Sequence, residues 1–192
     1  MNLTQDRLRA LIEDEAFELY GQPKWTFGKN TCNTYEVFAE VLHLPGGETE
    51  PGYGYVRKTA ADRQTSKVFS DWFMKSALGM IRRLIDQVGC DLVVAINFWP
   101  HSINSPDFVD ATKAELDRNG LAPRNLELEL TEVEQLNAKG VENLIALKDM
   151  GAKLIYDNFG IGTNNLYLLS RLPFDGIKLA RSSPQASPKT TR

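Results

Sequence analysis

The sequence predicts an α/β fold in which parallel β/α units follow a pair of antiparallel strands. Between residues 92 and 179, short apolar runs alternate with segments of helical periodicity, which is the pattern of parallel strands joined by crossover helices. The two strands before them are joined by a short turn at Gly28-Lys29-Asn30, and so close a connection favours antiparallel neighbours. With 192 residues, of which 42% are hydrophobic and 24% charged, the chain suits one globular domain.

The first part of the chain is expected to hold a helix, two strands, a loop and a long helix. Leu3, Leu8, Leu11 and Ile12 recur at helical spacing and predict the first helix, with Thr4 as its candidate N-cap. The other expected bounds are Glu15–Trp25 and Tyr35–Leu44 for the strands, 45–54 for the loop and Ser66–Gln87 for the long helix. The loop is assigned from its Pro and Gly residues. The long helix is the strongest periodic signal, because its apolar residues recur on one helical face.

The second part gives the alternating series. We expect strands at Leu92–Ile96, Leu126–Leu130, Lys153–Tyr156 and Gly176–Leu179, with helices at Asp107–Arg118, Val141–Asp149 and Asn164–Arg171 between them. Continuous apolar runs within these strands are typical of buried parallel strands. Residues 182–192 are rich in Ser, Pro and Thr, so we expect a disordered tail after a domain of residues 1–181.

Charge and cysteine content exclude several classes of protein. A formal net charge of -3 gives no basic field for a nucleic-acid polymer. Cys32 and Cys90 stand far apart and indicate neither a disulfide framework nor a zinc site. No stretch reads as a signal peptide or a membrane span. We therefore expect a cytoplasmic protein without a membrane partner.

A polar residue stands at or near the end of successive expected strands. Glu36 lies early in the second strand, and Asn97, Glu129, Asp157 and Lys178 follow in the β/α series. In a β/α barrel such residues converge on one rim, where carboxylates and an amide would suit Mg²⁺ or Mn²⁺. Taken singly, a helix cap or a solvated rim residue is the commoner explanation of each. Their succession favours a site.

Six short motifs, in this order, resemble those of the EAL phosphodiesterases. They are Gln22-Pro23, Glu36-Val37-Phe38, residues 96–100 (INFWP), residues 129–132 (ELTE), residues 157–162 (DNFGIG) and residues 177–181 (IKLAR). The resemblance extends from about Phe17 to Arg181. It implies a modified (β/α)₈ TIM barrel with one antiparallel strand, in which the last two β/α units are missing. It also implies two-metal hydrolysis of cyclic di-GMP to pGpG.

The resemblance assigns roles residue by residue. The implied metal ligands are Glu36, Asn97, Glu129, Asp157 and Asn158. Lys178, counted with Glu36 as catalytic, would orient the attacking water or screen the developing charge. Gln22 and Pro23 would face the substrate, and Glu132 would brace the loop from Phe159 to Asn165.

The sequence departs from the family pattern mainly at residues that carry chemistry. Asn158 replaces an aspartate, which should weaken binding of the second metal. Glu40 replaces an arginine that would contact phosphate, so cyclic di-GMP binding should be weak or lost. Trp99 replaces a serine, and Ala180 replaces an aspartate. The ring of Trp99 would either stand at the mouth of the site or pack in the core. The chain is also shorter than the roughly 250 residues of a full barrel.

Three functions fit these features. The first is a residual cyclic di-GMP phosphodiesterase. The second is a non-catalytic EAL-like regulatory module that binds a protein partner or a second copy of itself. The third is a shortened product with little function of its own. The sequence favours the second and third as descriptions of activity.

Overall fold

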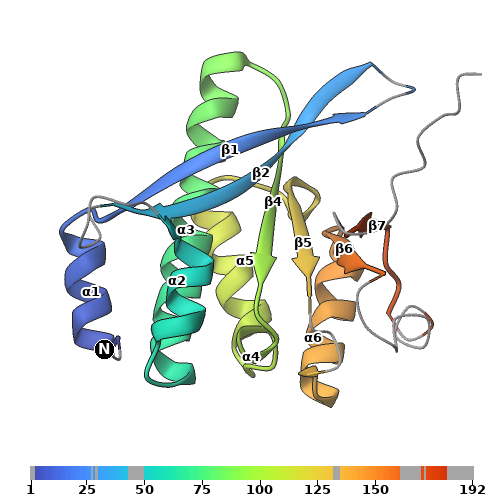
Figure 1. Cartoon of the computed structure of the whole chain (residues 1–192). Helices are drawn as coiled ribbons and strands as arrows, with labels where there is room; N and C mark the ends of the chain where they lie inside the picture. Colours follow the sequence, from blue (N-terminus) through green and yellow to red (C-terminus); the bar gives the residue numbers. More distant parts are fainter. Residues whose placement is uncertain are drawn as a thin grey trace, which may run out of the picture.

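The strands form one mixed sheet in the order β1-β2-β4-β5-β6-β7, with β3 paired beside β2. The computed structural model describes residues 3–26, 28, 30–42, 50–131, 135–160, 170 and 172–180, and Figure 1 shows their arrangement. The strand bounds are β1 Phe17–Thr26, β2 Thr31–Val41, β3 Glu50–Pro51, β4 Val93–Phe98, β5 Leu126–Leu130, β6 Lys153–Phe159 and β7 Gly176–Leu179.

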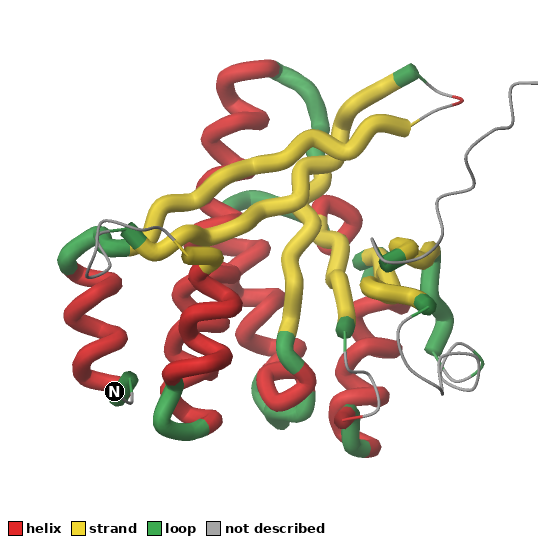
Figure 2. Tube along the Cα trace, in the orientation of Figure 1, coloured by secondary structure: helices red, strands yellow, loops and turns green. Residues whose placement is uncertain are grey.

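The pairing of the strands confirms the predicted class of fold. β1 runs antiparallel to β2, and Gly28 and Asn30 between them have φ angles of 60° and 51°, the left-handed values that a tight turn requires. From β2 onward, β4, β5, β6 and β7 are added in parallel. The sheet is curled like an open half of a barrel (Figure 2). Among the described strands, β1 and β7 are not paired with each other.

Four of the six helices in the described ranges lie where the sequence pattern predicts them, with small shifts at their ends, and the two short helices at 52–59 and 100–103 were not predicted. Their bounds are α1 Gln5–Glu13, α2 Gly52–Thr59, α3 Arg63–Val88, α4 Pro100–Ile103, α5 Phe108–Arg118 and α6 Ala138–Asp149, with a 3₁₀ turn at Pro123–Asn125. The Thr4 hydroxyl caps α1, and the Asp62 carboxylate accepts a hydrogen bond from the Thr65 N–H at 2.7 Å to cap α3. No helix in the described ranges has the length and apolarity needed to cross a membrane.

The two faces of β5 differ in polarity, and only one of them packs in the apolar core. Helices α3, α5 and α6 lie against one side of the parallel strands (Figure 1). Every residue of β5 is buried, and its strict alternation places Leu126, Leu128 and Leu130 on one face and Glu127 and Glu129 on the other. The leucines pack in the apolar core. The two glutamates therefore lie on the opposite face.

The expected loop over residues 45–54 is wrong at its C-terminal end. Residues 50 and 51 pair with β2 as β3, and α2 begins at Gly52. A Cβ on Gly52 would lie 3.2 Å from the Ala39 carbonyl oxygen and from the Phe17 ring. This glycine thus serves close packing of α2 on the sheet, where sequence reasoning took it as a turn residue.

Two other expectations cannot be compared with the structure. Most of the expected helix Asn164–Arg171 and the whole tail of residues 182–192 lie outside the described residues.

Candidate active site

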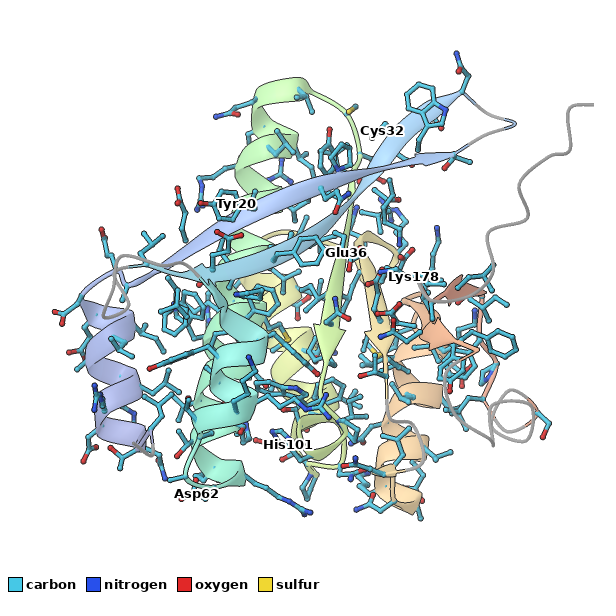
Figure 3. The ribbon with its side chains drawn as sticks, in the orientation of Figure 1. Tyr20, Cys32, Glu36, Asp62, His101 and Lys178 are labelled. Atoms are coloured by element: carbon cyan, nitrogen blue, oxygen red, sulfur yellow. The ribbon has the colours of Figure 1, made fainter. Side chains whose placement is uncertain are left out.

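Side chains from five strands meet on the inner side of the curled sheet. The Asn97 Nδ2 donates to Glu36 Oε1 at 3.1 Å and to Glu129 Oε2 at 3.4 Å. The Lys178 ammonium lies 2.9 Å from Glu36 Oε2, 2.6 Å from Glu129 Oε2 and 3.9 Å from Asp157 Oδ1. Figure 3 shows Glu36 and Lys178 pointing toward each other from β2 and β7. The convergence predicted from the strand ends is therefore present.

The strand register explains why these residues meet. Asn97 on β4 pairs with Glu129 on β5, so their side chains stand side by side on the same face. Gln22 on β1 lies directly opposite Glu36 on β2. Residues that are far apart in the sequence are thus aligned by backbone pairing alone.

Sequence reasoning missed two charged residues of this cluster. Lys24 on β1 contacts Glu127 through a salt bridge, and its ammonium also lies 2.9 Å from Glu129 Oε1. Glu127 is 5% exposed and Glu129 is fully buried. Glu127 stands two residues before a motif glutamate in an alternating strand, which is the one signal that could have placed it on the same face. We call Lys24, Glu36, Asn97, Glu127, Glu129, Asp157 and Lys178 the rim cluster.

Burial and neighbouring charges shift the pKa values of the two central carboxyl groups in opposite directions. Burial, reinforced by the adjacent Glu129, raises the pKa of Glu36 although Lys178 opposes the change. Burial alone would also raise the pKa of Glu129, but hydrogen bonds with Glu36 and Lys178 and the charge of Lys24 hold its pKa below the usual value. Glu129 is therefore the partner that stays ionised.

Both lysines remain charged in this setting. Burial by itself lowers the pKa of Lys24, yet its hydrogen bonds to Glu127 and Glu129 bring about a net rise. The pKa of Lys178 rises in the same way, because Glu129 and Glu36 outweigh the effect of burial. Two ammonium groups thus face four carboxylates within the rim cluster.

A cavity of about 820 Å³ adjoins the rim cluster. Gln22 and Pro23, the expected substrate-facing residues, line it together with Lys178. Its wall also contains Tyr53 and Arg57 from α2, the helix that sequence reasoning missed. The cavity is thus lined by polar, charged and apolar residues of the sheet, by Phe69 and Phe73 of α3, and by an aromatic and a cationic residue of α2.

Asn158 lies in a bulge of β6. Tyr156 pairs with Ile177 and Phe159 pairs with Leu179, so β6 has one residue more than β7 over this stretch. Asn158 adopts φ 59°, and its N–H donates to Asp157 Oδ1 at 2.8 Å. Asp157 and Asn158 both line the cavity. The bulge brings two consecutive polar residues to the same wall.

Other residues singled out in the sequence lie apart from the cluster. Trp99 is 4% exposed and packs against Tyr53 and Phe69, which supports its reading as core. Glu40 is half-buried on β2, and Ala180 is buried. Glu132 lies outside the described residues, so its bracing role stays a prediction.

The arrangement of the rim cluster does not fit a preformed metal site. Within the described ranges, no group of three His, Cys, Asp or Glu side chains is placed to hold a metal ion. The carboxylates of Glu36, Glu129 and Asp157 converge on the Lys178 ammonium, which lies between them. The ligand roles that the resemblance gives to Glu36, Asn97, Glu129, Asp157 and Asn158 stay predictions.

A curled sheet of parallel strands with a charged inner rim and an adjoining cavity defines a barrel-type α/β domain whose candidate ligand site lies at its strand ends. The model of the EAL domain matches residues 5–191, and the chain belongs to the EAL domain family.

Curated relatives support this assignment. Cyclic di-GMP phosphodiesterase RocR of Pseudomonas aeruginosa is 32% identical over 94% of this chain and 45% of the relative. Cyclic di-GMP phosphodiesterase NbdA of the same organism is 27% identical over 98% of this chain and 24% of the relative. The chain thus spans between a quarter and just under half the length of these relatives.

Solved structures agree with the fold. The EAL enzyme Bd1971, in a form with cAMP and cyclic di-GMP bound, matches with a TM-score of 0.81 and 21% identity over 93% of this chain and 49% of that chain. The PaMucR phosphodiesterase in complex with cyclic di-GMP matches with a TM-score of 0.77 and 24% identity over 92% and 71%. At these identities the likeness establishes the fold alone.

Proposed function

We propose that this chain is an EAL domain of cyclic di-GMP signalling in which hydrolysis of cyclic di-GMP to pGpG is weak or lost. One observation carries the proposal. Both oxygens of the buried Glu129 are engaged by lysines, Oε1 by Lys24 and Oε2 by Lys178. Members of the family generally depend on divalent metal ions such as Mg²⁺ or Mn²⁺, and here the central carboxylate is already neutralised by the protein's own cations.

The cavity supports cyclic di-GMP as the ligand. Its volume of about 820 Å³ lies within the roughly 300–1,000 Å³ of typical ligand pockets. Tyr53 and Phe38 in its wall offer faces on which a guanine base can stack. Arg57 and Lys178 offer positive charge to a phosphate. The names of RocR and the PaMucR complex indicate the same ligand for those relatives.

The side chains of this chain can bind and orient such a ligand. Gln22 can donate to or accept from a base edge or a phosphate, while Glu36, opposite it, faces Lys178. Lys178 holds its proton because Glu129 and Glu36 stabilise the ammonium form, so it acts as a fixed positive charge and not as a base. An ammonium held in this way attracts a phosphate, but it cannot accept a proton from the attacking water.

Incubation with cyclic di-GMP in the presence of Mn²⁺, followed by chromatography for pGpG, tests the proposal. RocR serves as the positive control and Glu129→Gln as the negative one. We expect wild-type turnover close to that of Glu129→Gln. Turnover comparable to that of RocR would overturn the proposal.

A second candidate is a non-catalytic module that binds a protein partner or a second copy of the chain. The observation that favours it is the exposure of Ile177 and Leu179 on β7, at 46% and 68%. Sedimentation of wild type and Leu179→Ser over a range of concentrations tests self-association. Dimers in wild type that are lost in the variant would support a homodimer, and monomers in both would exclude it.

A further inference from the structure

The residue that links β1 to the rim-cluster carboxylates of β5 is Lys24, for which the family resemblance provides no role. It follows the Gln22-Pro23 motif on β1 and reaches the face of β5 that carries Glu127 and Glu129, more than 100 residues later in the sequence. Both of these carboxylates are buried and lie on the same face of their strand. Lys24 is itself half-buried.

Glu127 depends on this lysine for neutralisation. In the described part of the chain, Lys24 is the cation paired with Glu127, whereas Glu129 is paired with both Lys24 and Lys178. A buried carboxylate that loses its partner is strongly unfavourable, because it keeps its charge away from water. Removing Lys24 would therefore leave a local excess of negative charge that another cation could satisfy.

The two lysines also compete with a divalent ion for Glu129. An ion that binds Oε1 competes with Lys24 for this oxygen, and an ion that binds Oε2 competes with Lys178. In either case it faces the remaining ammonium across one carboxylate group, and like charges at such short range repel. The salt bridges of the rim cluster therefore oppose binding of a divalent cation.

We propose that Lys24 is an internal counter-ion that holds Glu127 and Glu129 and excludes a divalent cation from the rim cluster. This deepens the proposed function, because it names a residue that weakens metal-dependent hydrolysis in this chain. The lysine acts as a positioning residue through the carboxylates.

The test is a titration with Mn²⁺ alone, without nucleotide, followed by the electron paramagnetic resonance signal of the free ion and by calorimetry. The proteins are wild type, Lys24→Met, Lys24→Arg and the control Lys113→Met, which removes an exposed lysine of α5. We expect at least tenfold tighter binding of Mn²⁺ by Lys24→Met than by wild type. Lys24→Arg and Lys113→Met should bind Mn²⁺ with the same affinity as wild type. Equal affinity of wild type and Lys24→Met would overturn the proposal.

A second readout separates exclusion of a cation from a purely structural salt bridge. Lys24→Met should have a lower Tm than wild type without metal, and added Mn²⁺ should narrow that difference. A Tm difference that stays constant when Mn²⁺ is added would show that Lys24 only stabilises the fold. Should Lys24→Met fail to fold, the double variant Lys24→Met/Glu127→Gln removes the unpaired charge and should still bind Mn²⁺ more tightly than wild type.

These outcomes are independent of the proposed function. Rapid production of pGpG by wild type would refute weak hydrolysis, whereas the Mn²⁺ titration is judged without any nucleotide. If Lys24→Met gains Mn²⁺ binding and still makes no pGpG, the counter-ion proposal stands and the remaining defect lies elsewhere in the site.

Discussion

Glu18 and Glu40 lie directly opposite one another in the antiparallel ladder of β1 and β2. Like charges in this position destabilise a strand pair. Glu40→Arg should therefore raise the free energy of unfolding by about 0.5–1 kcal/mol, the usual size of a cross-strand pair effect. It should also strengthen binding of cyclic di-GMP, because the family resemblance places an arginine that contacts phosphate at this position. Urea unfolding and calorimetry with cyclic di-GMP in Ca²⁺ measure the two effects.

Glu40→Gln separates repulsion from attraction. It removes the like charge without adding a cation, so it should give much of the gain in stability and little of the gain in binding. Tight binding of cyclic di-GMP by wild type would show that the phosphate contacts come from other residues, such as Arg57 in the cavity wall.

Asn158→Asp alone should increase the production of pGpG less than tenfold over that of wild type. The charge that it adds does not alter Glu40 or the lysines that engage Glu129, and effects at separate sites roughly add. The backbone should accept the change, because Asp tolerates the left-handed conformation nearly as well as Asn. A gain of several hundredfold in the chromatographic assay would mean that the missing aspartate is the principal defect.

Asp62 makes the stability of the fold dependent on pH through the cap of α3. Hydrogen bonds from the backbone N–H and hydroxyl of Thr65 hold its pKa below the usual value in the folded state. A carboxyl group with a lowered folded pKa stabilises the fold above its unfolded pKa, and this stabilisation is lost as pH falls through the folded pKa. Asp62→Ala should lower Tm at pH 7.

The conservative variant Asp62→Asn isolates the charge, since an amide oxygen can still cap the helix. The Tm difference between wild type and Asp62→Asn should shrink as pH falls below about 4, where an ordinary Asp becomes protonated. Thermal scans from pH 7 to pH 3 measure it. A difference that is constant over this range would exclude ionised Asp62 as the cause.

Asn143 joins α6 to the segment after β4. Its buried amide donates to the carbonyl oxygens of Ile103 and Ser105, each at 2.8 Å. Asn143→Ala leaves both acceptors without this donor and should lower the free energy of unfolding by about 2–3 kcal/mol. The neighbouring Glu142→Ala, whose exposed contact with Lys139 spans 3.6 Å, should change it by less than about 0.5 kcal/mol. Equal losses in both variants would contradict this account.

The sequence predicted what depends on local pattern and missed what depends on long-range placement. The alternation of strands and helices implied the parallel series, and polar strand ends implied the convergence of Glu36, Asn97 and Glu129. Lys24 carried no such signal, because its partners lie about 100 residues away and a lysine in an exposed strand usually faces solvent. Contacts of this kind follow from the curl of the sheet, which no local pattern encodes.

Helix α2 shows the opposite failure, in which a local rule was applied too readily. The run of Pro51, Gly52 and Gly54 has the composition of a loop. Gly52 is needed because α2 packs closely against β2, and the helix still forms because Val56 is buried in the core. Arg57 and Tyr53 were missed as cavity residues for the same reason.

Because of the bulge at Asn158, β6 should tolerate deletion of this residue better than deletion of a regularly paired one. Deleting a residue from a regular strand turns every later side chain to the other face of the sheet. Deleting Asn158 would instead restore one-to-one pairing with β7 and keep Tyr156 and Phe159, whose rings are in contact, on the same face. A variant shorter by this one residue is therefore expected to fold, with a single polar side chain in place of two at the cavity wall.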